Sequence, residues 1–188
     1  MNIPKVAKSS KNILARTLFC LSLFAPCVQS LADTSRRSPS DDGTFTAGPY
    51  YNSATRSYFE LIRNNFYTWD QAEDEAANHS YKNTPGRLAV IDRPETHRFL
   101  VRNFTFLQDT WIGLRFFCEE STLFWPDGIS HQGKPFSNWS ITSEHRNLTC
   151  PQTGYLYTII NRNAFDWTLA QWNVEAQYTL IEYPTGRR

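Results

Sequence analysis

The sequence predicts an α+β fold, in which two helices pack on antiparallel sheets. Two stretches between residues 68 and 107 carry apolar side chains at helical spacing. Short apolar runs that are typical of strands lie before and after these stretches. The 188-residue chain also has 13 Phe, 9 Tyr and 6 Trp, which are enough large side chains to bury the core of one domain.

The first 32 residues have the pattern of an export signal. Four basic residues and no acidic residue precede or flank an apolar run at 18–28, which is shorter than the roughly 20 residues that a spanning helix needs. Small side chains at Ser30 and Ala32 favour cleavage before Asp33. We therefore predict a signal peptide over 1–32 and a secreted or periplasmic protein, with an uncleaved anchor as the alternative.

The charge of the remaining chain excludes one class of partner. Residues 33–188 carry 15 basic and 18 acidic groups, so their net charge is −3. A nucleic-acid-binding surface requires a basic face, and we expect no nucleic-acid partner. No stretch after the signal peptide is long and apolar enough to predict a membrane span.

The elements expected first are a hairpin and a helix. Residues 33–47 are polar and rich in turn formers, which predicts a flexible lead-in before a domain over 48–184 and a tail over 185–188. A hairpin is expected over 50–62. Thr68 and Gln71 have the spacing of a capping box and predict a helix from there to Asn78.

A second helix and a series of strands are expected next. Pro94 and Glu95 begin a pattern in which Leu100, Phe104 and Leu107 recur at helical spacing. Apolar runs then predict strands over 111–117, 122–125, 155–160, 165–172 and 177–183. The polar stretch between Trp139 and Tyr155 has no periodicity, and a loop of this length in a compact domain is usually functional or mobile.

Two cysteines remain once the signal peptide is removed, Cys118 and Cys150. Cysteines in an oxidising compartment most often form a disulfide, although two separate buried thiols are the alternative. Two cysteines are too few for a structural zinc site, and we expect no metal there.

Six segments in order resemble the motifs of the C-type lectin-like domain, over about residues 48–184. The front half resembles the family in its hairpin, its two helices and the segment Gly86–Ile91. In the second half, five segments resemble family motifs: Trp111–Leu114 (the family's WIGL), Phe124–Gly128 (its W-x-D-G turn), Phe136–Trp139, Trp172-Asn173 (its W-N-D) and Tyr178–Tyr183. The resemblance implies a C-type lectin-like fold with packing roles for Trp111, Trp125 and Trp139.

The cysteines depart from the family pattern. The family's first cysteine falls near Ala76 or Ala77, and its partner position in the last strand is Ile181. Two apolar residues can still pack where that disulfide is lost. Cys150 matches a family cysteine whose usual partner is missing, so the resemblance leaves Cys118 as its mate.

The family's sugar site is a calcium site, and its oxygen ligands are depleted here. Members supply a Glu-Pro-Asn or Gln-Pro-Asp triplet and the Asn-Asp of W-N-D, whereas this chain lacks the triplet and has Val174 after Asn173. Calcium prefers six to eight oxygen ligands, so we expect no metal and no cofactor. The candidate ligand-binding residues are Glu144, Asn147, Asn173 and Glu175.

No catalytic motif appears, because the chain lacks a G-x-S-x-G elbow, an H-E-x-x-H helix, a phosphate loop and a Cys-x-x-Cys pair. We expect a secreted, non-catalytic binding module that recognises a carbohydrate or a protein, without calcium, through a long-loop face formed by 140–154 and 163–173. The alternatives are a calcium-dependent lectin with an unconventional site and a structural or adhesion component that pairs with a partner protein. The oligomeric state stays open.

Overall fold

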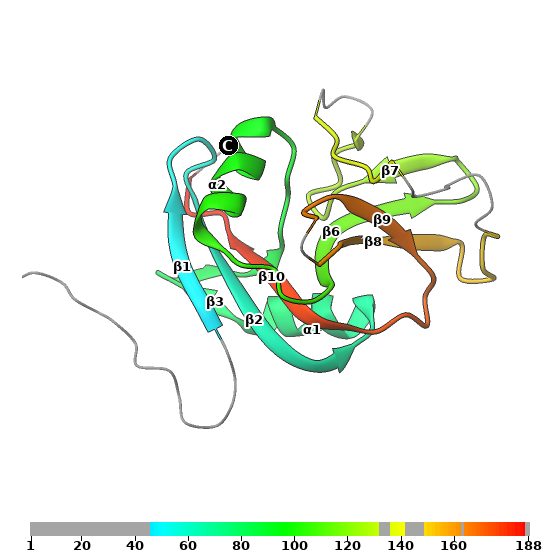
Figure 1. Cartoon of the computed structure of the whole chain (residues 1–188), viewed down its shortest axis with the longest axis horizontal. Helices are drawn as coiled ribbons and strands as arrows, with labels where there is room; N and C mark the ends of the chain where they lie inside the picture. The colour runs from blue at the N-terminus through cyan, green and yellow to red at the C-terminus, as the bar shows by residue number, and fades with distance from the viewer. Residues whose placement is uncertain (1–45, 132–135, 142–148, 163, 187–188) are drawn as a thin grey trace, which may run out of the picture. The chain divides into compact units, whose positions relative to one another are not determined.

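A computed structural model describes residues 46–131, 136–141, 149–162 and 164–186. Two α-helices and ten strands are assigned within these ranges (Figure 1). In chain order they are β1 (Thr46–Asn52), β2 (Ser57–Tyr67), α1 (Trp69–Asn78), β3 (Ser80–Tyr81), β4 (Thr84–Pro85), β5 (Arg87–Leu88), α2 (Pro94–Asn103), β6 (Thr110–Phe117), β7 (Thr122–Phe124), β8 (Tyr155–Ile160), β9 (Trp167–Ala170) and β10 (Ala176–Tyr183).

Eight of the described strands form one sheet, in the order β1-β2-β10-β6-β8-β9, with β5 paired to β10 and β7 paired to β6. All its pairs are antiparallel except β10 with β6. The last strand in the sequence therefore lies in the middle of the sheet, between the opening hairpin and the later strands (Figure 1). This arrangement and the two helices confirm the predicted α+β class.

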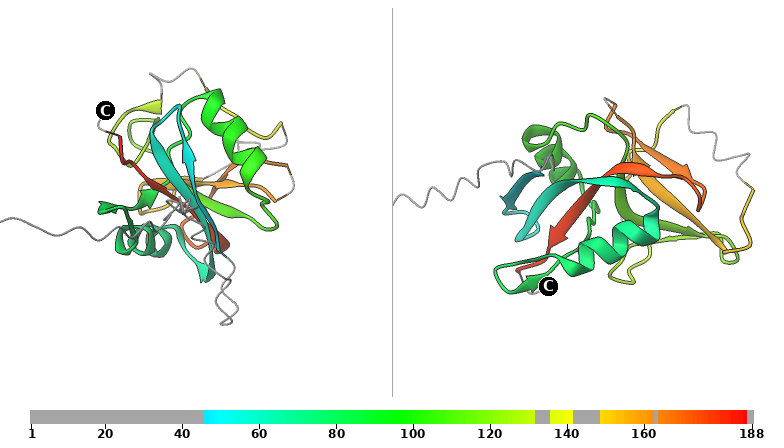
Figure 2. Two further views of the ribbon diagram at one scale, coloured as in Figure 1. Left: turned by 90° about the vertical axis from the view of Figure 1, so that its left-hand side faces the viewer. Right: turned by 90° about the horizontal axis from the view of Figure 1, so that it is seen from below.

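The two faces of β2 and β10 belong to two different hydrophobic cores. Tyr178 and Leu180 of β10 lie in one core, whereas Ile181 and Tyr183 lie in the other. Because successive side chains of a strand point to opposite faces, both faces of β10 are buried. Helix α1 covers one core and α2 the other, on opposite sides of this part of the sheet (Figure 2).

Helix α1 begins where the sequence predicts. The Thr68 side chain and the Gln71 side chain form a capping box at its first turn, and the Thr68 N–H donates to Gln71 Oε1 at 3.0 Å. Trp69, Ala72 and Ala76 recur on one face and are fully buried. Asp70 and Asp74 are exposed on the other side of the helix.

Helix α2 is shorter than predicted. It ends at Asn103, whose side chain donates to the carbonyl oxygen of Phe99 at 2.7 Å. The chain continues in an extended conformation, in which Phe104 and Phe106 are buried and Leu107 is 53% exposed. The helical spacing of Leu100, Phe104 and Leu107 was therefore misleading, because burial after Asn103 follows a period of two rather than 3.6.

The positions of the family's lost disulfide are packed with apolar side chains, as predicted. Ala76 and Ile181 are both fully buried in the same core. Gly86 lies between them, since a Cβ there would come within 2.9 Å of the Ile181 side chain and clash with the Ala76 carbonyl. The absence of a side chain at Gly86 allows this close approach.

The strands differ from the predictions mainly at their ends. β1 begins at Thr46, before the expected start of the domain, and β9 spans Trp167–Ala170 rather than 165–172. The apolar segment 88–91 is fully buried, and only its first residue belongs to a strand. The small pair β3–β4 was not predicted, because each strand has two residues.

Neither described helix is long and apolar enough to cross a membrane.

Candidate functional site

Two of the four predicted ligand-binding residues, Asn173 and Glu175, lie on the connection from β9 to β10. Both are exposed. Glu144 and Asn147 lie outside the described residues. The structure therefore places Asn173 and Glu175 on an accessible surface.

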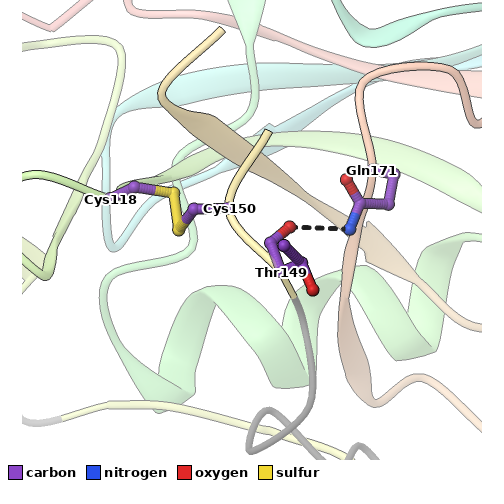
Figure 3. The surroundings of a disulfide bond; sticks show 4 residues. All are labelled: Cys118, Thr149, Cys150 and Gln171. Atoms are coloured by element: carbon purple, nitrogen blue, oxygen red, sulfur yellow. Dashed lines mark hydrogen bonds between the residues drawn. A yellow bond between two sulfur atoms is a disulfide. The ribbon is translucent and has the colours of Figure 1, made fainter. Parts of the chain in front are cut away.

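A disulfide fixes the chain at the border of this surface. Cys118, at the end of β6, is bonded to Cys150, before β8, and their Cα atoms are 6.0 Å apart (Figure 3). The Gln171 side chain donates from Nε2 to the carbonyl oxygen of Thr149 at 3.0 Å (Figure 3). Cys150 is thus joined covalently to the end of β6, and Thr149 is joined by a hydrogen bond to the segment after β9.

A hollow of about 450 Å³ lies between these two attached segments. Its lining consists of Thr149, Cys150, Pro151, Gln152, Thr153, Gln171 and Trp172. None of these lining residues is charged, and the set combines hydroxyl and amide groups with the apolar surfaces of an indole and a proline. Its volume falls within the roughly 300–1,000 Å³ of small-molecule sites.

Trp172 differs from the other described tryptophans. Its side chain is 54% exposed, whereas Trp69, Trp111, Trp125 and Trp167 are at most 1% exposed. The prediction that Trp111 and Trp125 serve packing is confirmed, and Trp139 is half-buried against the core that α2 covers. An exposed indole has a large apolar face and an N–H donor available to a ligand.

Sequence reasoning missed Trp172 as a site residue. It was interpreted only as the first letter of the Trp-Asn pair that resembles W-N-D. Its sequence setting gives no signal, because the fully buried Trp69 and Trp167 also lie between two polar residues.

The described residues at the family's calcium position do not fit a calcium ion. Val174, which stands where the family has a carboxylate, packs its side chain against the core that α1 covers. Its N–H donates to the Gln171 carbonyl oxygen at 3.1 Å in a turn. In the described turn, Asn173 supplies one amide oxygen and Glu175 one carboxylate, fewer than the six to eight ligands that calcium takes. Within the ranges that the structure describes, no three His, Cys, Asp or Glu side chains gather as a metal site.

The fold is that of C-type lectin-like domains. No protein-family model matches the sequence, and no curated protein matches it. Solved structures do match. The mouse scavenger receptor C-type lectin carbohydrate-recognition domain is 17% identical with a TM-score of 0.56, and the match covers 74% of this chain and 98% of that domain.

Two further structures agree with this assignment. The C-type lectin CEL-I from Cucumaria echinata is 14% identical with a TM-score of 0.51, over 77% of this chain and 97% of that chain. SPL-1, solved as a complex with GlcNAc, is 14% identical with a TM-score of 0.53, over 79% and 97%. At these identities the likeness shows the fold, and the predicted C-type lectin-like fold is confirmed.

Proposed function

We propose that this chain is an exported, non-catalytic module that binds a neutral carbohydrate at the hollow beside Trp172 without a calcium ion. The exposed indole of Trp172 is the observation that carries the proposal. One face of a pyranose ring presents C–H groups, and these pack on the electron-rich face of an aromatic ring. Trp172 also lies in the lining of a hollow whose other polar groups are neutral, which favours a role in binding.

The polar lining of the hollow suits hydroxyl groups. The Thr149 and Thr153 hydroxyls donate and accept, and the amides of Gln152 and Gln171 have both an acceptor and a donor end. No charged side chain of the lining selects for an ionic ligand. This combination of an apolar platform and a few neutral hydrogen-bonding groups matches a neutral sugar better than an ion or a purely apolar ligand.

The structural neighbours support the same ligand class. One is named as a carbohydrate-recognition domain, and SPL-1 was solved with GlcNAc. The signal-peptide pattern of residues 1–32 supports export, and an exported protein meets the glycans of cell surfaces. The absence of the known catalytic motifs from the sequence supports a binding role rather than an enzyme.

A glycan array tests the proposal. We expect the wild-type protein to bind a subset of neutral glycans and the Trp172→Ala variant to bind them at least tenfold more weakly, which corresponds to about 1.4 kcal/mol. Tyr51→Ala is the matched control, because Tyr51 is 49% exposed but lies on β1, away from the hollow. Equal binding by the wild type and Trp172→Ala would contradict this site, and failure to bind any glycan would contradict the ligand class.

A further inference from the structure

A second hollow, of about 320 Å³, lies over β6, β7 and the start of β8. Arg115, Phe117, Phe124 and Tyr155 contribute to its lining, together with the exposed Glu120. It shares no lining residue with the hollow at Trp172. The chemistry of the two hollows also differs, because the second is lined by a cation and a carboxylate.

Aromatic rings hold the guanidinium of Arg115 in place. Its central carbon lies 4.8 Å from the centroid of the Trp69 ring and 5.5 Å from that of the Tyr155 ring. Trp69 is fully buried on α1, and Tyr155 is stacked on Phe117 with ring centroids 5.0 Å apart. A guanidinium packed on rings that are themselves fixed loses little further freedom when it binds a ligand.

The hydrogen-bond donors of Arg115 remain available. Among the residues that the structure describes, its guanidinium makes ring contacts but no hydrogen bond and no ion pair. The register places Arg115 opposite Phe124 of β7 and Tyr157 of β8, neither of which is an anion at neutral pH. Such a planar group with five N–H donors matches a carboxylate through two parallel hydrogen bonds.

Carboxyl groups of α1 lie near this cation, but none that the structure describes forms an ion pair with it. Burial raises the pKa of Glu73 on α1, and the attraction of Arg115 opposes that rise. Burial and the Asp70 carboxylate raise the pKa of Tyr157 to about 12, so its hydroxyl stays neutral and donates to Asp70. Glu120 is exposed, where water and salt screen its repulsion of an anion.

We propose that this hollow is a second glycan site that binds an acidic sugar residue, with its carboxylate on Arg115 and its ring against Tyr155 and Phe117. The stacked aromatic pair offers an apolar surface to the C–H groups of the sugar ring. The Glu120 carboxylate can accept hydrogen bonds from sugar hydroxyls. The proposal does not depend on the site at Trp172, so each can fail while the other stands.

Ligand-observed NMR titration with methyl β-D-glucuronide, and with methyl β-D-glucoside as the neutral match, tests this site. We expect a protein carrying Trp172→Ala, which removes the neutral site, to bind the glucuronide about tenfold more tightly than the glucoside. In that background Arg115→Gln should remove the preference, and Arg115→Lys should retain only part of it because a single ammonium cannot form the two parallel bonds. Tyr51→Ala, on β1, should leave it unchanged. Thermal unfolding of each variant shows whether it is folded.

Three results would overturn the proposal. One is equal affinity of the Trp172→Ala protein for the glucuronide and the glucoside. Another is an acid preference that survives when folded Arg115→Gln is added to that background, or that disappears when Tyr51→Ala is added. The third is competition by acetate as effective as that of the glucuronide, which would show recognition of a carboxylate without its sugar ring.

Discussion

Replacing Trp69 by alanine should lower the free energy of unfolding by about 3–5 kcal/mol. The indole is fully buried, its N–H donates to the Ile112 carbonyl oxygen at 2.8 Å, and it stacks on Tyr157 with ring centroids 4.9 Å apart. Alanine would leave a cavity at the contact between α1 and β6 and an unpaired carbonyl group. It would also remove the ring beneath Arg115.

Chemical denaturation followed by circular dichroism measures this loss. Trp69→Phe is the control, because it retains an aromatic ring but cannot donate the hydrogen bond, and we expect it to fall between the wild type and Trp69→Ala. A loss below about 1 kcal/mol for Trp69→Ala would contradict the packing described for α1.

Replacing both Cys118 and Cys150 by serine should cost about 3–4 kcal/mol. The two residues are 32 positions apart, and in the chain-entropy model a closed loop of this length restricts the unfolded chain by that amount. For a domain of this size the melting temperature should fall by roughly 10 °C. The variant should also bind neutral glycans less tightly, because the disulfide fixes one side of the hollow at Trp172.

Thermal unfolding with and without a reductant provides the control for this prediction. Reductant should lower the melting temperature of the wild type toward that of the double serine variant and leave the variant itself unchanged. An equal effect of the reductant on both proteins, or no effect on either, would contradict a stabilising bond between these cysteines.

Features that depend on local sequence were predictable. The capping box at Thr68 and Gln71 depends on residues three positions apart, and α1 begins there as expected. The motifs resembling C-type lectin-like domains identified the fold because their order and spacing hold over most of the domain. The structure also contains the bond between the two cysteines that remain after the signal peptide.

Features that depend on distant parts of the chain were not predictable. The hollow at Trp172 forms because Thr149 and Gln171, which are 22 positions apart, are joined by a hydrogen bond. The availability of Arg115 depends on rings from α1 and β8, and no spacing in the sequence indicates which arginine is held in this way. The end of α2 was misplaced because Phe104 satisfies a helical and an extended pattern equally well.

The affinity for a bound neutral glycan, measured by isothermal titration calorimetry in millimolar calcium and again in EGTA, tests the central proposal most directly. Calcium-free recognition through Trp172 predicts dissociation constants that agree within about twofold in the two buffers. It also predicts that Trp172→Ala is weakened equally in both. Binding that disappears in EGTA and returns when calcium is restored would contradict the account and establish a calcium-dependent lectin with an unconventional ligand set.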